Sequence, residues 1–141
     1  MGRVELHLDQ DPAHVRVVRL VSAAVGRMAG LGDETLHEVR LGVSEACGLA
    51  IDALAASGID TPMSLEFEDD AGLRVTVRTA AALPDPAIVT SVEPGTAGGR
   101  PTADPVVLDR LALIEGLIDD VVIKSGPDGS AITMRWQAGL G

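Results

Sequence analysis

Three histidines and one cysteine are the nitrogen and sulfur ligands that the chain could offer to zinc. His7, His14 and His37 do not share the short, regular spacing of zinc-binding motifs. Cys47 falls on the core-facing side of a predicted helix, where a thiol packs as a small apolar group. The sequence therefore predicts no metal site.

Ser22 and Ser44 are candidate nucleophiles, but the sequence shows no recognisable catalytic triad of either serine with a histidine and a carboxylate. Serines on helices usually face solvent or donate a hydrogen bond to a carbonyl of the preceding turn. We therefore expect no nucleophilic catalysis at either serine.

Arg16 and Arg19 form a basic pair in a chain whose formal net charge is −10. Their three-residue spacing lets both point outward from the same side of a predicted helix. Such a pair can dock on a carboxylate patch of a partner protein. It can equally be a solvated basic edge, and the sequence leaves both interpretations open.

Composition limits the kind of partner. The acidic charge argues against a nucleic acid as partner. Proteins bind nucleic acids mainly through cationic side chains that replace the counterions of the phosphates, and a chain of net charge −10 is not suited to this. Phe67 and Trp136 are the only aromatic residues, so stacking on bases or sugars is not expected. No apolar run approaches the roughly 20 residues that span a bilayer. Since a single cysteine fits a reducing compartment, we expect a cytoplasmic protein without membrane contact.

The elements that position these residues follow from the hydrophobic pattern. Residues 4–8 alternate as a strand, and Asp11-Pro12 is typical of a helix start. The core-facing positions of this first helix are predicted to be Val15, Val18, Val21, Val25 and Met28. A second helix is predicted from about Asp33 to a stop at Gly58. Its core-facing positions are predicted to be Leu36, Val39, Val43, Ala46, Ala50 and Leu54.

Two strands and a long loop come next. Residues 63–67 and 73–77 alternate on either side of a hairpin turn at 69–72. Proline and glycine are frequent from about 80 to 105, which predicts a flexible, lid-like loop.

The C-terminal part completes the fold. A third helix is predicted at 106–118, followed by a hairpin of strands at 121–124 and 131–136. The order β-α-α-β-β-loop-α-β-β predicts one α+β domain over residues 1–141. We expect a two-layer α/β sandwich, with a mostly antiparallel sheet covered on one face by helices.

This order resembles that of the RsbW-like anti-sigma factors, which have the GHKL (Bergerat) ATPase fold of histidine kinases. Residues 41–51, Leu-Gly-Val-Ser-Glu-Ala-Cys-Gly-Leu-Ala-Ile, resemble the family's N-box helix with its Glu-Ala-x-x-Asn-Ala pattern. Residues 117–121 and 126–130 resemble the family's C-terminal ending. The resemblance covers nearly the whole chain and implies a histidine-kinase-like ATPase domain.

The resemblance assigns roles to Glu45 and Leu49. In kinases of the family the N-box glutamate is the general base on a substrate serine, and the asparagine four residues later holds Mg²⁺ against the ATP phosphates. Glu45 is kept here, but Leu49 has no oxygen to offer a metal. Glu45 is therefore catalytic only if the protein is an active kinase. Otherwise it is a solvated carboxylate beside the core.

The family's other nucleotide-binding motifs are altered as well. The Asp-x-Gly-x-Gly turn, whose aspartate accepts the adenine amino group, falls on Thr79, Ala81 and Leu83. The phosphate-cradling Gly-x-Gly stretch falls on Asp104-Pro105, for which Gly98-Gly99-Arg100 is a weak substitute. ATP and Mg²⁺ are the ligands that the family implies. We nevertheless expect no cofactor to be bound here.

Three functions remain open at this point. The first is an anti-sigma-like regulator that acts by protein binding in a partner-switching system controlling transcription. The resemblance implies a sigma factor, an anti-anti-sigma (STAS) protein or both as partners, and a homodimer; Arg16 and Arg19 are the expected partner-binding residues. The second is an active ATP-dependent serine kinase that phosphorylates an anti-anti-sigma factor. The third is a pseudo-ATPase that binds an unrelated regulator.

Overall fold

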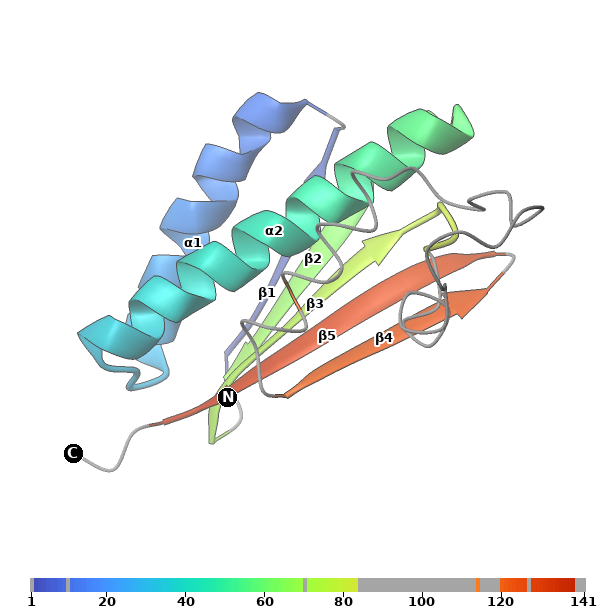
Figure 1. The fold of residues 1–141 in the computed structure, drawn as a ribbon. Helices are drawn as coiled ribbons and strands as arrows, with labels where there is room; N and C mark the ends of the chain where they lie inside the picture. Colours follow the sequence, from blue (N-terminus) through green and yellow to red (C-terminus); the bar gives the residue numbers. More distant parts are fainter. Residues whose placement is uncertain are drawn as a thin grey trace, which may run out of the picture.

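Two helices cover one face of a five-stranded antiparallel sheet in the computed structural model of this protein (Figure 1). The structure describes residues 2–9, 11–69, 71–83, 114, 120–126 and 128–138. Its elements are β1 (Arg3–Leu8), the 3-10 turn η1 (Pro12–His14), α1 (Val15–Met28), α2 (Asp33–Ser57), β2 (Met63–Asp69), β3 (Gly72–Thr79), β4 (Val121–Gly126) and β5 (Gly129–Gln137). The strands lie in the order β1-β2-β3-β5-β4. The predicted α+β class and the sheet covered on one face are confirmed.

The first helix begins with a turn that Asp11 caps. The Asp11 carboxylate accepts a hydrogen bond from the Ala13 amide at 2.9 Å, and its carbonyl accepts one from the His14 amide at 3.0 Å. Residues 12–14 therefore form a 3-10 turn, and α1 itself starts at Val15.

The buried side of α1 differs from the prediction at its C-terminal end. Val18 and Val25 are buried as expected, but Met28 is 79% exposed. Gly30 has φ +83° and turns the chain, so that Leu31 occupies the core at this end of the helix. Because Leu31 fills that place, Met28 faces away from the sheet.

The second helix contributes more residues to the hydrophobic core than the first. All six of its predicted core positions are buried, and Cys47 beside them is fully buried too. The helix contacts β3 and β5, the central strands of the sheet, whereas α1 contacts β2 and β3. Gly58 ends α2 in the left-handed conformation, with φ +66°, as predicted.

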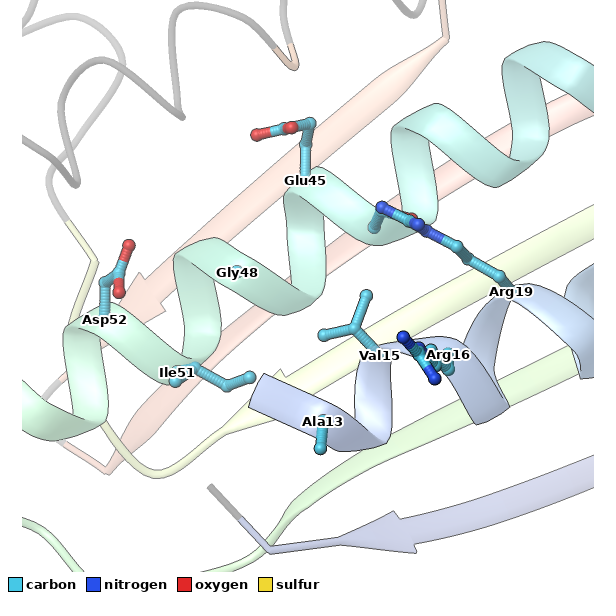
Figure 2. Close-up of a pocket in the computed structure, with 9 residues that line it drawn as sticks. Ala13, Val15, Arg16, Arg19, Glu45, Gly48, Ile51 and Asp52 are labelled. Atoms are coloured by element: carbon cyan, nitrogen blue, oxygen red, sulfur yellow. The ribbon is translucent and has the colours of Figure 1, made fainter. Parts of the chain in front are cut away.

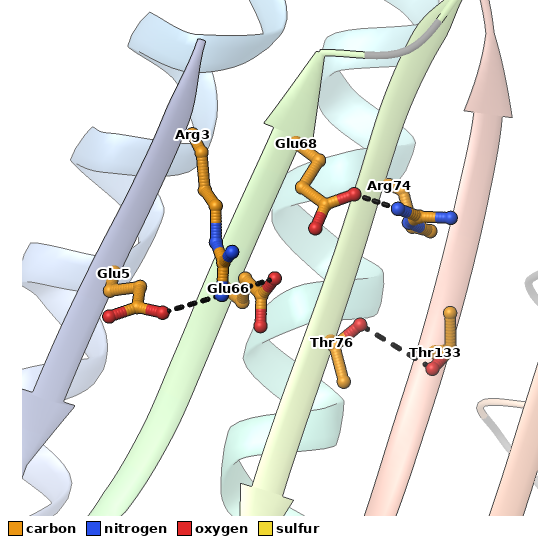
Figure 3. Close-up of polar contacts among 7 residues, drawn as sticks. All are labelled: Arg3, Glu5, Glu66, Glu68, Arg74, Thr76 and Thr133. Carbon is orange, nitrogen blue, oxygen red and sulfur yellow. Dashed lines mark hydrogen bonds and ion pairs between the residues drawn. The ribbon is translucent and has the colours of Figure 1, made fainter.

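The two faces of the sheet differ in polarity. Residues such as Phe67, Val75 and Met134 point to the helices and are fully buried. The opposite face carries polar side chains that pair across strands (Figure 3). On that face Arg3 binds Glu5 at 2.8 Å and Glu66 at 3.0 Å, Arg74 binds Glu68, and Thr76 bonds Thr133 at 3.4 Å. The Arg3–Glu5 pair is exposed on both sides, and a pair of that kind adds little stability.

Parts of the predicted topology fall outside the described residues. This applies to residues 84–105 of the predicted lid-like loop and to most of the predicted third helix at 106–118. Within that helix only Ile114 is described, and it is helical and fully buried. The two predicted hairpins are confirmed, with β5 extending one residue beyond Trp136.

Gly72 is required where β2 turns into β3. Its φ of +143° is one that other residues rarely adopt, and an added Cβ would overlap the Trp136 carbonyl oxygen and lie 2.9 Å from the Ala138 nitrogen. Gly58 also has a positive φ but has open space around it. An alanine at Gly72 would therefore meet both backbone strain and a steric clash, whereas an alanine at Gly58 would meet only the strain of the left-handed conformation.

We predict that Gly72→Ala lowers the free energy of unfolding by about 3 kcal/mol or more, since strain and overlap add. Gly58→Ala should cost only about 1 kcal/mol, the usual penalty of the left-handed region. Urea denaturation of both variants measures the difference. Equal losses would show that the Trp136 carbonyl does not constrain this turn.

Burial raises the pKa of the Cys47 thiol from 9.0 to about 12. Below pH 9 the thiol is neutral in both the folded and the unfolded chain, so it adds no pH dependence. Above pH 9 the unfolded chain ionises first, because only there is the thiolate solvated, and stability falls as pH rises. The slope is at most about 1.4 kcal/mol per pH unit.

We predict that Cys47 resists aqueous thiol reagents in the folded protein and reacts once urea unfolds it. The stability of the wild type should also fall between about pH 9 and 12. Cys47→Ala is the control, because the sequence has no tyrosine that would ionise in the same pH range. In this variant most of the decrease in stability above pH 9 should disappear. Rapid labelling under native conditions would contradict the burial.

Candidate functional site

A pocket of about 420 Å³ lies between the start of α1 and the middle of α2 (Figure 2). Its lining residues are Ala13, Val15, Arg16, Arg19, Ser44, Glu45, Gly48, Ile51 and Asp52. The two helices thus bring Arg16 and Arg19, the basic pair of the sequence, to the same pocket as Glu45 of the N-box-like segment.

Arg19 is held in place by α2. Its Nε donates a hydrogen bond to the Ser44 hydroxyl at 2.7 Å, and that hydroxyl donates to the Arg40 carbonyl at 2.6 Å. Ser44 is only 7% exposed, while Arg16 and Arg19 are both exposed. Arg19 therefore reaches across the groove between the helices instead of standing straight out from α1, as Figure 2 shows.

Two carboxylates form the opposite side of the pocket. Glu45 and Asp52 are seven residues apart, which is two helical turns, and Gly48 lies between them. In Figure 2 both side chains point to the same side of α2, away from α1. Both are partly exposed. The pocket therefore has arginines on its α1 side, and the two carboxylates of α2 lie at its edge, directed away from α1.

Asp52 and Ser44 are members of this site that the sequence reading missed. The signal for Asp52 was its two-turn spacing from Glu45. Ser44 was considered only as a nucleophile, whereas its hydroxyl serves as the acceptor that orients Arg19. Its buried position became evident only from the packing of α1 on α2.

Leu49, one turn beyond Glu45, is fully buried within the hydrophobic core. Its aliphatic side chain has no atom that could coordinate a metal. The segment that resembles the N-box thus has a carboxylate at the pocket and, one turn later, an apolar side chain in the core.

The segment after β3 is bound to the β4–β5 hairpin. Thr79 is 6% exposed, and its hydroxyl accepts a hydrogen bond from the Ala81 amide at 3.3 Å. Ser130 donates to the Ala81 carbonyl at 2.8 Å and accepts from the Leu83 amide at 2.9 Å. Ser125 accepts from that amide at 2.9 Å as well. Polar groups at these positions are therefore satisfied within the protein.

These hydroxyls belong to a second pocket, of about 480 Å³, at the end of the sheet. Thr79 lines it together with Arg78, Lys124 and both hairpin serines. None of the described residues lines both pockets. The structure therefore places Arg16, Arg19 and Glu45 together and Thr79 elsewhere, with Ala81 fully buried.

Other candidates from the sequence do not gather. Among the described residues, no group of three or more histidine, cysteine, aspartate or glutamate side chains could hold a metal ion. The altered phosphate motif at Asp104-Pro105 and the Gly98-Gly99-Arg100 stretch lie outside the described residues.

No helix in the described part of the chain has both the length and the apolar character needed to cross a membrane.

The chain is similar to known proteins both in sequence pattern and in fold. The model of the histidine kinase-like ATPase domain family matches residues 8–136. A search of curated proteins found no match. A crystal structure of the RsbU and RsbW domains of Rv1364c from Mycobacterium tuberculosis is similar, with a TM-score of 0.65 and 14% sequence identity. The match covers 97% of this chain and 32% of that one, so this chain spans about a third of the length of its structural neighbour.

Proposed function

The chain belongs to the histidine kinase-like ATPase domain family, and we propose that it is an RsbW-type regulator that acts by binding other proteins. Its partners in this proposal are a sigma factor, an anti-anti-sigma protein of the STAS class or both, within a cytoplasmic partner-switching system that controls transcription. A homodimer, as the resemblance implies, is part of the proposal. The similarity in fold to a chain that contains an RsbW domain supports it.

The observation that carries the proposal is the charged pocket between α1 and α2. In a chain of net charge −10, two exposed arginines lie together at a groove, and Ser44 orients one of them. Oriented arginines lose less side-chain entropy on binding, and their guanidinium groups can pair with carboxylates of a partner. Glu45 and Asp52 add acceptors for a partner's cations, so the pocket can select a partner of matching charge pattern.

The residues at the family's nucleotide positions support a role without phosphate transfer. Leu49 is buried and apolar where a metal ligand is needed. Thr79 has no carboxylate for the adenine amino group, and its hydroxyl already accepts the Ala81 amide. These residues do not fit ATP–Mg²⁺.

Glu45 is the observation that favours the alternative, an ATP-dependent serine kinase acting on an anti-anti-sigma factor. It is partly exposed at the pocket, where it could take a proton from a substrate hydroxyl. Incubation with labelled ATP and a purified STAS protein separates the two functions. Phosphate transfer that Glu45→Gln abolishes would establish the kinase and overturn the proposal.

We predict that the protein does not bind ATP–Mg²⁺ at micromolar concentrations. Calorimetric titration should show only heats of dilution, and the melting temperature should not change at millimolar ATP. A nucleotide present at 100 times its Kd would stabilise the fold by about 2.7 kcal/mol, which is a readily measured shift. A rise of several degrees in the melting temperature contradicts this prediction.

We predict that reversing the two pocket arginines abolishes partner binding without unfolding the domain. The protein is immobilised, partners are captured from its native host, and mass spectrometry should identify a sigma factor or a STAS protein. Affinity for the purified partner should then fall by about 2–5 kcal/mol in Arg16→Glu/Arg19→Glu, as for charge-paired arginines at interfaces.

The matched control is Arg78→Glu/Arg135→Glu, which makes the same charge change on the polar face of the sheet. This control should keep its affinity. Ser44→Ala leaves both charges but removes the acceptor for Arg19, so it should weaken binding by a smaller factor. If the pocket variant binds the partner as well as the wild type does, the pocket is not the docking site. If neither partner class is captured, the regulatory proposal fails.

A further inference from the structure

Helix α1 exposes a row of apolar side chains on the side facing away from the sheet. Met28 and Leu20 are the most exposed large apolar residues in the described part of the chain, at 79% and 73%, and Val17 is 44% exposed. Ala24 between them is exposed as well. The spacings of three, four and four residues put these side chains on one side of the helix. We call Val17, Leu20, Ala24 and Met28 the α1 seam.

The seam is separate from the surface that holds α1 to the protein. Val18, Ser22 and Val25 form the buried side of the helix and pack against the rest of the core. A helix with one apolar side needs only one neighbour, and α1 has a second apolar side. A narrow row at three- and four-residue spacing is typical of the contact between two helices.

The charges of α1 indicate what kind of helix fits. Its 14 residues include Arg16, Arg19 and Arg27 and no carboxylate. Arg16 lies one turn before Leu20 and Arg27 lies two turns after it, so both border the same edge of the seam. Both are exposed. A partner helix with carboxylates along the facing edge would pair with them.

Two other occupants fit less well. A second copy that paired through the seam would bring Arg16 and Arg27 of both copies to the same contact, with no carboxylate on either α1 helix. A membrane surface would meet a seam without the aromatic residues that anchor amphipathic helices at a lipid interface. Methionine and alanine instead allow close and adaptable packing of another helix.

We propose that the α1 seam binds an acidic amphipathic helix of a partner protein. The apolar side of that helix packs on Val17, Leu20, Ala24 and Met28, and its carboxylates pair with Arg16 and Arg27. The inference rests on the proposed function, because it names the chemistry of the partner that the regulator binds. It adds a helix-binding surface beside the charged pocket.

The test uses two synthetic amphipathic peptides as long as α1, with leucines at helical spacing. One carries flanking glutamates, and the other carries lysines at the same positions. Fluorescence anisotropy should show binding of the glutamate peptide to the wild-type protein and no binding of the lysine peptide. Leu20→Gln should weaken binding by about tenfold, the loss expected when one large apolar contact is removed.

Two further variants separate packing from charge. Val122→Gln replaces an exposed apolar residue on β4, outside the seam, and should leave peptide affinity unchanged. Arg27→Glu leaves one arginine and one glutamate at the edge of the seam, so the preference for the glutamate peptide over the lysine peptide should be lost. Because these side chains are exposed, circular dichroism should show that each variant folds normally.

Several outcomes would overturn the inference. One is that neither peptide binds, or that Leu20→Gln has no effect. Another is that the seam binds phosphatidylserine vesicles and Leu20→Gln abolishes this, which assigns it to a membrane. A third is that Leu20→Gln abolishes self-association, which assigns the seam to a second copy. If neither peptide binds but the arginine pocket still binds its partner, only the proposal for the seam is wrong. If a peptide binds but no sigma factor or STAS protein is captured, the proposed function is wrong.

Discussion

The packing of α2 across the centre of the sheet is the interaction on which the other features depend. One side of this helix, from Leu36 to Leu54, is buried along its length, and its contacts are with the central strands β3 and β5. Burial of apolar surface on this scale is the main source of stability in a domain of this size. It also fixes the rotation of the helix about its axis, so Glu45 and Asp52 must lie on the outer side.

The position of α1 follows from that of α2. Val18 and Val25 join the same core, and the hydrogen bond from Arg19 to Ser44 ties the outer sides of the two helices together. The bond is partly buried, where solvent screens it less than at the surface. One helix pair therefore creates two adjoining surfaces, the charged pocket in the groove and the apolar seam beyond it.

The residues that the sequence resemblance assigns to nucleotide binding have structural roles within the fold. Glu45 is partly exposed on α2, and Leu49 contributes to the core. At the end of β3, Ser130 and Thr79 satisfy the backbone groups of Ala81 and Leu83. Polar groups that are already paired in the interior gain little from a ligand that would have to replace those partners.

The sequence by itself determined the elements and their order within the described residues. Periodicity located α2 and its six core positions, the Asp69–Gly72 turn located the first hairpin, and Gly58 marked a helix end. These features are local, because each depends on residues within a few turns of one another. The arginine pair follows from the same local spacing, whereas Glu45 and Leu49 were identified through the resemblance to the N-box of the RsbW-like family.

Only the tertiary structure decided which of these residues meet. Met28 continues the apolar spacing of α1, yet it is exposed because Leu31, beyond the turn, fills the core in its place. Ser44 acts on Arg19 across 25 positions of sequence, and no spacing rule connects residues on different helices. Whether an apolar side chain is covered, or a charge is oriented, depends on what packs against it, and that is a property of the assembled layers.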